Sequence, residues 1–306
     1  MAKKRLVLIL GPTAVGKSRL ALRLAADFNG EIINCDSMQV YRGFDIGTDK
    51  PGLEMRQQVP HHLLDIIDPH DQFNAATFVS FALKAIEEII SRHRLPFVVG
   101  GTGLYIKALI DGLFPGPGRD PQIRQQIEEE GRQYGFPHLH AKLMTIDPEY
   151  GRKIHPNDRI RIVRALEIYT LTGRPISEHF KKTQPYLKDF LIVKIGLKLD
   201  REELKSKIEE RVERMFARGM VEEVKQLLAK GVNPKAPPFQ ALGYKQVLRY
   251  LRKEISLEEA IELTKKETKQ YAKRQMTWFR QMSGITWFNP EEYEKIKMFL
   301  KEKLGN

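Results

Sequence analysis

Cysteine is almost absent from the sequence: Cys35 is the only one among 306 residues. A single thiol cannot build a disulfide framework within the chain and cannot supply a cysteine-based zinc site. No apolar run approaches the length that crosses a bilayer, and the N-terminal residues lead into a strand too short for a signal peptide. No amphipathic anchor or lipidation motif is present. We therefore expect a cytoplasmic protein that has no membrane partner.

Acidic residues are also few relative to basic ones. The chain has 39 Asp and Glu against 51 Lys and Arg, which gives a net charge of +12. Such an excess favours a polyanionic partner, nucleic acid before membrane, although surface lysine also serves solubility. The length is enough to bury a full core and to hold a second piece of structure.

One segment satisfies the pattern of a phosphate-cradling loop, which is Gly, any four residues, Gly, Lys, and Ser or Thr. It reads Gly11-Pro12-Thr13-Ala14-Val15-Gly16-Lys17-Ser18. A short apolar run at 5–10, typical of a buried strand, precedes it, and a segment of strongly helix-forming residues at 19–26 follows it, as the motif requires. Backbone N–H groups and the helix N-terminus would face an anion. Lys17 would reach the phosphate oxygens, and the Ser18 hydroxyl would bind a Mg²⁺ ion that carries them.

The order of the other elements predicts an α/β fold with a P-loop NTPase-like parallel sheet flanked by helices. Further strands are expected at 31–36, 96–99 and 190–195, and a helix at 75–92. Prolines and glycines at 112–118 indicate a linker into an all-helical insertion, which is broken near 135–137 and 155–158. Later helices are expected at 201–218, 221–230, 244–252 and 257–282. We expect a core domain at 1–114 and 190–306 with a helical C-terminal part, and an insertion at 115–189.

Polar residues follow the second expected strand at the same edge of the sheet as the phosphate loop. They are Asp36, Ser37, Met38 and Gln39. A carboxylate in this place can accept a proton from a nucleophile or bind magnesium, and an amide can read a base edge. An Asp that caps the following turn is the plain structural alternative. The glycine-rich end of the third strand adds Thr102 as a donor and acceptor at this edge.

Other polar residues carry weaker signals. His61 and His62 are adjacent in a loop, where structural roles are more common than contact with a substrate. Three basic stripes fall on expected helices: Arg159, Arg161 and Arg164; Lys207, Arg211, Arg214 and Arg218; and Lys266, Lys269, Lys273 and Arg280. A stripe of this kind is usually a solvated surface. Three of them in a basic chain favour contacts with a nucleic-acid backbone.

With these pieces in order, the chain resembles the bacterial tRNA dimethylallyltransferases, also called tRNA isopentenyltransferases. The resemblance spans nearly the whole length. It rests on the phosphate loop and on segments 36–42, 45–51, 60–63, 99–105, 155–158, 164–167, 240–246 and 271–280. Each motif is modest alone, but the ordered set is specific. The zinc finger of some eukaryotic relatives is absent.

The resemblance implies a prenyl transferase that moves a dimethylallyl group from dimethylallyl diphosphate to the N6 amine of an adenosine. That adenosine lies 3′-adjacent to the anticodon and is flipped out of the stem-loop. Residues 11–18 and Arg211 would hold the diphosphate, with Mg²⁺ on Ser18, and Asp36, Lys17 and Thr102 would be catalytic, Asp36 as general base. A monomer is expected.

The resemblance also implies positions that contact the tRNA anticodon stem-loop. In the core these are Asp36, Ser37, Met38, Gln39 and Thr102, and in the insertion Arg124, Ile160, Arg161, Ile162, Val163 and Arg164. In the C-terminal part they are Gln240, Ala241, Leu242, Gly243, Tyr244, Lys245 and Gln246, and the segment 269–276, in which Lys269, Lys273 and Arg274 are the basic candidates.

Two functions of other classes stay open on the sequence. A P-loop kinase that phosphorylates a small molecule or nucleotide with ATP would use the same loop, but it does not explain the long basic and aromatic C-terminal part. A non-catalytic RNA-binding NTPase switch would need a carboxylate that positions hydrolytic water. Prenyl transfer to tRNA accounts for more of the chain than either.

Overall fold

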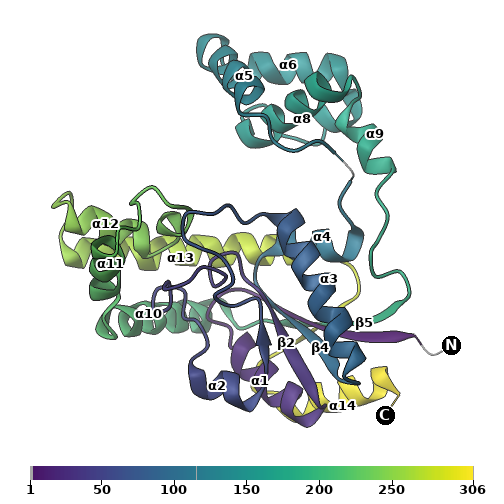
Figure 1. Ribbon diagram of the computed structural model, residues 1–306, viewed down its shortest axis with the longest axis vertical. Helices are drawn as coiled ribbons and strands as arrows, with labels where there is room; N and C mark the ends of the chain where they lie inside the picture. The colour runs from purple at the N-terminus through teal and green to yellow at the C-terminus, as the bar shows by residue number, and fades with distance from the viewer. Residues whose placement is uncertain (1–2, 115, 306) are drawn as a thin grey trace. The chain divides into compact units, whose positions relative to one another are not determined.

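A six-stranded sheet, parallel throughout, organises the computed structural model, which describes residues 3–114 and 116–305 (Figure 1). Its strands are β1 (Lys4–Leu10), β2 (Gly30–Cys35), β3 (His61–His62), β4 (Leu95–Gly100), β5 (Phe190–Leu197) and β6 (Ile285–Phe288). Across the sheet they run β3-β2-β4-β1-β5-β6, so β1 is central and pairs with both β4 and β5. This is the expected P-loop NTPase-like α/β class. The phosphate loop follows β1 and therefore lies near the middle of the sheet edge at which the strands end.

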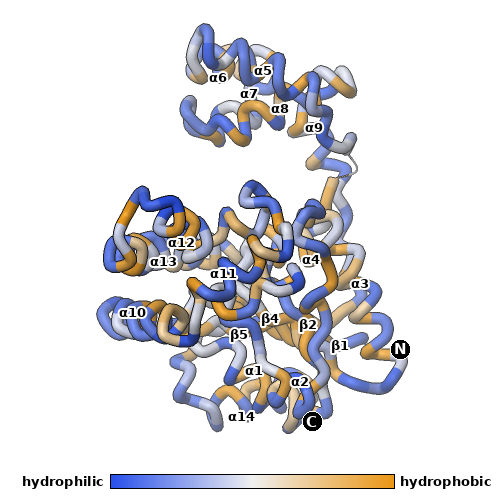
Figure 2. Tube along the Cα trace, turned by 60° about the vertical axis from the view of Figure 1, so that its left-hand side comes forward, coloured by the Kyte–Doolittle hydropathy of each residue, from blue (hydrophilic) through white to orange (hydrophobic). Residues whose placement is uncertain are grey.

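Helices cover both faces of the sheet, which explains why the buried part of the central strand β1, residues 6–10, is a continuous apolar run. On one face α1 (Lys17–Asp27) and α14 (Tyr293–Leu304) pack on side chains such as Ile9 and Ile195. On the other face α3 (Ala75–Ser91) packs on β2 and β4. Figure 2 shows these strands as the hydrophobic centre of the core. A fully buried side chain such as Leu24 stabilises the fold by about 1.5–3 kcal/mol.

Two elements at the C-terminus were not expected from the sequence. β6 has only four residues and lies at the sheet edge, too short for a periodic pattern to predict. α14 is rich in Lys and Glu, yet its Ile296, Leu300 and Leu304 are buried against the sheet. Their spacing of four residues was the available signal. The two-residue β3 was also missed.

The C-terminal helices form a group beside the sheet (Figure 1). They are α10 (Arg201–Ala217), α11 (Met220–Ala229), α12 (Tyr244–Leu251) and α13 (Leu257–Arg280), with a 3-10 turn, η1, at Pro237–Gln240. α13 begins where Ser256 and Glu259 cap each other's backbone N–H groups. These helices enclose a second apolar core around the segment after β2, in which Phe44 contacts Phe239 and Tyr244. The bounds expected for α10, α11, α12 and α13 are confirmed within two residues. A short α2 (Leu53–Gln58) precedes β3.

Residues Leu109–Tyr186 form a compact unit of their own. After the end of α4 (Gly103–Asp111), it contains α5 (Pro121–Tyr134), α6 (Phe136–Ile146), α7 (Pro148–Gly151), α8 (Arg159–Thr172) and α9 (Ile176–Lys181). Its core includes Leu139, Leu143 and Ile162. Helix breaks at Gly135 and before Arg159 fall where the sequence predicted them. The predicted insertion starts at Pro115, which lies outside the described residues, and its bounds of 115–189 stay a prediction. Within residues 3–114 and 116–305, no helix combines the length and apolarity that spanning a membrane requires.

Candidate active site at the phosphate loop

The backbone of the phosphate loop requires glycine at two places. Gly11 follows β1 with φ 152°, and a Cβ there would lie 2.7 Å from the Leu197 carbonyl oxygen. Gly16 is the N-cap of α1 with φ 93°, in the left-handed region that glycine adopts without strain. The loop therefore curls over the N-terminus of α1, whose backbone N–H groups are oriented to receive an anion.

Lys17 is folded back onto this loop. Its Nζ donates a hydrogen bond of 2.7 Å to the Pro12 carbonyl oxygen. Burial, and next the positive charge of Arg211, lower the pKa of Lys17 to about 7, against the opposite effect of Asp36 and Cys35. A bound polyphosphate would reverse this shift, because a negative charge close by favours the protonated amine.

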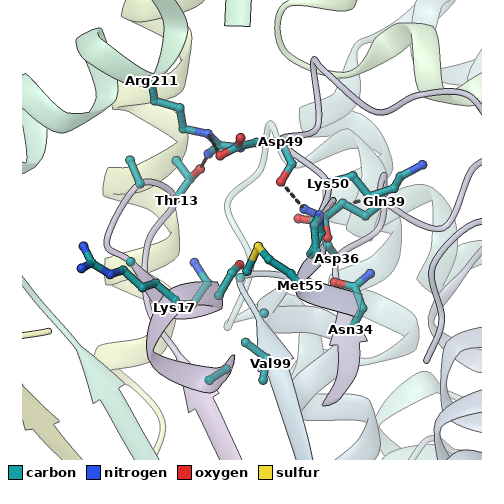
Figure 3. A pocket seen from close by; sticks show the side chains of 18 of the residues that line it. Thr13, Lys17, Asn34, Asp36, Gln39, Asp49, Lys50, Met55, Val99 and Arg211 are labelled. Carbon is teal, nitrogen blue, oxygen red and sulfur yellow. Dashed lines mark hydrogen bonds and ion pairs between the residues drawn. The ribbon is translucent and has the colours of Figure 1, made fainter. Parts of the chain in front are cut away.

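A cavity of about 490 Å³ opens over the loop (Figure 3). Its wall includes Thr13, Lys17 and Ser18 from the loop and α1, Asp36 and Gln39 after β2, and Asp49 and Lys50 before α2. Four basic residues of the α10 segment, Lys207, Arg211, Arg214 and Arg218, also line it. The basic side of α10, one of the three stripes that favoured contacts with a nucleic-acid backbone, therefore lies on the wall of the phosphate-loop cavity, and its contact with RNA stays a prediction.

Arg211 links three segments at this wall. Its guanidinium donates to the Thr13 hydroxyl through Nη1 and to the Thr48 carbonyl oxygen through Nη2, the latter at 3.2 Å. Nε lies 3.1 Å from the Asp49 carboxylate. Figure 3 shows the side chain directed toward both Thr13 and Asp49. The position of Arg211 thus fits its assignment to a diphosphate. Its contacts with Thr13, Thr48 and Asp49 could not be predicted from the sequence around Arg211.

A second cavity, of about 220 Å³, adjoins the first. Much of its wall is apolar, from Met38, Val212, Met215 and Leu242. Thr13, Asp36 and Arg211 line both cavities and therefore lie at their junction. A charged ligand in the first cavity and a less polar one in the second would meet at these three side chains.

Asp36 caps the turn after β2, which is the structural alternative, and its geometry is compatible with the chemical one. Its Oδ1 accepts hydrogen bonds from the backbone N–H groups of Met38 at 2.8 Å and Gln39 at 3.3 Å, so it caps the turn after β2. Within the described residues, no hydrogen bond engages Oδ2. The carboxylate thus has a fixed orientation and one oxygen available at the junction of the cavities.

The other predicted residues of this edge have distinct places. Ser37 and Met38 line the second cavity, whereas Gln39 lines the first. The Gln39 amide donates to the carbonyl oxygens of Thr48 and Asp49, so it holds the following loop. Thr102 lines neither cavity; its hydroxyl accepts from the Ser37 backbone N–H at 3.3 Å.

Gln275 of α13 lies in the segment 269–276 that the resemblance assigns to tRNA contact, and its side chain holds the phosphate loop. Its side-chain oxygen accepts from the Thr13 N–H, and its amide nitrogen donates to the Gly101 carbonyl oxygen at 2.9 Å. Thr264, Thr268 and Tyr271 of the same helix line the second cavity. The spacing of these three residues and Gln275 places all four on one side of α13. A row of uncharged polar residues on one helix face is the sequence signal that could have indicated this part of the site.

The paired histidines are chiefly structural. His62 Nε2 lies 2.6 Å from the buried carboxylate of Glu31, which Arg92 and Arg94 also contact. His61 lines the first cavity, and burial lowers its pKa. The preference for a structural role therefore agrees with the contacts of His62.

The residues expected to contact RNA in the helical unit divide into exposed and internal ones. Ile160 and Arg161 are exposed, whereas Ile162 and Val163 belong to the unit's core, so their side chains are not accessible to RNA. Arg124 and Arg164 both pair with the fully buried carboxylate of Glu167, at 3.0 and 2.8 Å.

The C-terminal candidates divide in the same way. Gln240, Ala241, Leu242 and Arg274 line the second cavity. Gly243, Tyr244 and Gln246 are buried: the Tyr244 hydroxyl donates to Glu223, and Gln246 accepts from the Gly243 N–H. Lys245 pairs with Glu267 and Lys269 with Glu209, while Lys273 is exposed.

No cluster of three or more His, Cys, Asp or Glu side chains in the part of the chain that is described could hold a metal ion. Ser18, in the first turn of α1, is exposed and lines the first cavity. A magnesium ion at this place would need most of its oxygen ligands from the phosphates and water, which is its usual behaviour in phosphate sites.

Comparison with known proteins identifies the group to which this site belongs. Residues 39–282 match the family model described as IPP transferase. The tRNA dimethylallyltransferase of Geobacter sulfurreducens is 48% identical over 305 residues, which cover 99% of this chain and 98% of that protein. The corresponding enzyme of Acetivibrio thermocellus is 44% identical over 96% of this chain and 95% of its own.

Solved structures agree in fold. The tRNA isopentenylpyrophosphate transferase of Bacillus halodurans superimposes with a TM-score of 0.74 at 43% identity, covering 99% of this chain and 97% of that one. A eukaryotic dimethylallyltransferase described as acting on tRNA gives a TM-score of 0.81 at 32% identity, covering 98% and 77%. With a family match over most of its length and relatives of this identity, the chain belongs to the IPP transferase family.

Proposed function

We propose that this protein transfers a dimethylallyl group from dimethylallyl diphosphate to the N6 amine of the adenosine 3′-adjacent to the anticodon of a tRNA. The observation that carries the proposal is the pair of adjoining cavities, one basic and one largely apolar, with Thr13, Asp36 and Arg211 lining both. The relatives named tRNA dimethylallyltransferase support the reaction class and do not favour the kinase alternative.

The diphosphate of the donor would occupy the first cavity. The N–H groups of the loop, the Lys17 amine and the Arg211 guanidinium would stabilise the charge that grows on the diphosphate as the carbon–oxygen bond breaks. Thr13 would face the same end of the donor through a hydroxyl that Arg211 already contacts. A loop held in this shape before binding need not reorganise during the reaction, which is the main advantage of such stabilisation.

The acceptor adenine would enter from the second cavity after leaving its stack in the anticodon loop. An exocyclic adenine amine is a weak nucleophile, because its lone pair is delocalised into the ring. As the nitrogen–carbon bond forms, Oδ2 of Asp36 would accept the amine proton, while Oδ1 stays bound to the Met38 and Gln39 N–H groups. Diphosphate leaves with the electron pair of the broken bond, so atoms and charge balance.

The donor set fits Mg²⁺ bound by the Ser18 hydroxyl together with phosphate oxygens, where the ion would supply further charge neutralisation. RNA contacts are proposed at the exposed residues of the predicted set, among them Arg161 and Lys273. The cavity residues Gln240 and Arg274 would lie close to the flipped nucleotide. We propose a monomer as the active form.

The test is incubation with labelled dimethylallyl diphosphate and unmodified tRNA, followed by nucleoside analysis, on wild type and Asp36→Asn. The Asn side chain keeps the Oδ1 acceptor of the turn but cannot take a proton. We expect single-turnover transfer to fall by about 10²–10⁴-fold, the usual contribution of a positioned base, with little change in the binding of either substrate. Near-normal transfer by the variant would remove Asp36 from the mechanism. ATP hydrolysis by wild type without prenyl transfer would overturn the proposal as a whole.

A further inference from the structure

The first cavity already contains a carboxylate at the place where a diphosphate would be held. Asp49 lies 3.1 Å from Arg211, 3.6 Å from Arg218 and 4.0 Å from Arg214. All four side chains line the cavity. Three guanidinium groups on one helical segment thus share one internal counter-ion, and its negative charge faces the same space as the phosphate loop.

The Asp49 contacts are ionic and geometrically poor. Nε of Arg211 is buried and, among the described residues, has no hydrogen-bond acceptor in spite of the nearby carboxylate. The Arg214 and Arg218 side chains are more than half exposed, and their distances to Asp49 exceed ordinary hydrogen-bond length. Pairs of this kind are weak and easily exchanged for a better anion. A diphosphate carries more charge and more acceptor oxygens than one carboxylate.

The loop that carries Asp49 does not depend on its carboxylate for its shape. Gln39 donates to the carbonyl oxygens of Thr48 and Asp49, and Arg211 donates to that of Thr48. On the other side, the buried Lys50 amine contacts Asp45, Asp65 and the Tyr41 carbonyl oxygen. Asp49 itself has φ 55°, a left-handed conformation that Asn adopts as readily as Asp. A change from Asp to Asn therefore removes the charge and keeps the backbone.

We propose that Asp49 is a resident counter-ion of the diphosphate cavity, which competes with the diphosphate of the donor and of the product for Arg211, Arg214 and Arg218. The inference rests on the proposed function, since it takes the first cavity to be the diphosphate site. In the free protein Asp49 holds the three arginines over the cavity. After transfer, the same carboxylate competes with the leaving diphosphate and so favours its release.

Binding of inorganic diphosphate, measured by titration calorimetry on the full chain, tests the competition directly. Asp49→Asn should bind diphosphate about tenfold more tightly than wild type, because the ligand no longer displaces a charge partner. Product inhibition by diphosphate in the prenylation assay should increase by a similar factor. The matched control is Glu210→Gln. Glu210 lines the same cavity and lies on α10, the helix of the arginines, but its side chain accepts a hydrogen bond from the Ser206 hydroxyl. Its neutralisation should change diphosphate affinity by about twofold or less, the effect of net charge alone.

Each outcome decides the matter. Tighter binding confined to Asp49→Asn supports the competition. Equal or weaker binding by Asp49→Asn would overturn it, because a carboxylate that merely orders the arginines must weaken binding when removed. Equal tightening by both variants would also overturn it, in favour of a general charge effect. Absence of diphosphate binding by wild type would instead remove the diphosphate site, and with it both this inference and the proposed function.

Discussion

The side-chain oxygen of Gln275 accepts a hydrogen bond of 2.8 Å from the backbone N–H of Thr13. The amide nitrogen of the same side chain donates to the Gly101 carbonyl oxygen. One buried side chain of α13 thus sets the spacing between the phosphate loop and the end of β4, where Thr102 contacts the Asp36 segment through Ser37. In the proposed reaction the prenyl donor and the acceptor adenine would meet across this spacing.

Gln275→Glu should keep the acceptor for Thr13 but place a carboxylate oxygen against the Gly101 carbonyl oxygen. Because an unsatisfied buried polar contact costs about 1–3 kcal/mol, we expect kcat/KM for the donor to fall by roughly 10–100-fold. Affinity for tRNA should stay near that of wild type. Steady-state kinetics with each substrate varied, together with filter binding of tRNA, checks this. A loss confined to tRNA affinity would place Gln275 in the RNA interface.

Diphosphate binding should be coupled to proton uptake by Lys17. The amine is charged only when protonated, so a pKa lowered to about 7 leaves it mostly neutral in the free enzyme at pH 8. A bound diphosphate restores the ordinary lysine pKa, and close to one proton should be taken up at pH 8. Affinity should weaken by up to about tenfold per pH unit above pH 7.

Calorimetry in buffers of different ionisation enthalpy measures this uptake. Lys17→Ala should abolish it and should also abolish turnover, while tRNA affinity stays nearly unchanged. Proton release on binding, or uptake that persists in Lys17→Ala, would show that another group carries the linkage.

Replacing Arg161 and replacing Arg164 should affect stability and RNA affinity differently, although both residues were expected to contact RNA. Arg164 pairs with the buried Glu167, so Arg164→Ala leaves that carboxylate with fewer partners and should destabilise the helical unit by about 1–3 kcal/mol. Arg161 is exposed, and Arg161→Ala should leave stability unchanged. If Arg161 binds a phosphate, its loss should reduce the slope of log affinity against log salt by roughly one.

Thermal unfolding and tRNA titrations at several salt concentrations separate the two effects. An unchanged salt slope in Arg161→Ala would identify that residue as ordinary surface. An unchanged melting temperature in Arg164→Ala would mean that Arg124 alone satisfies Glu167.

Local patterns in the sequence were enough to predict the phosphate loop and most of the fold. The loop is recognisable because Gly11, Gly16, Lys17 and Ser18 act through backbone geometry and short-range chemistry that eight consecutive residues specify. The start of helix α13 is predictable for the same reason, since Ser256 and Glu259 form a capping box there. The polar segment after β2 could be placed near the loop because parallel strands end at one edge.

The tertiary structure alone decided which distant side chains complete the site. Thr13 and Gln275 are 262 positions apart, and although the uncharged polar face of α13 can be read from the sequence, nothing local pairs Gln275 with Thr13. The basic face of α10 reads the same in sequence whether it faces RNA or a cavity, and only packing directs Arg211 and Arg218 toward Asp49. Arg164 likewise resembles a surface arginine until the buried Glu167 is seen. Side-chain chemistry is local to a sequence, but burial and the identity of a charge partner depend on how the elements pack.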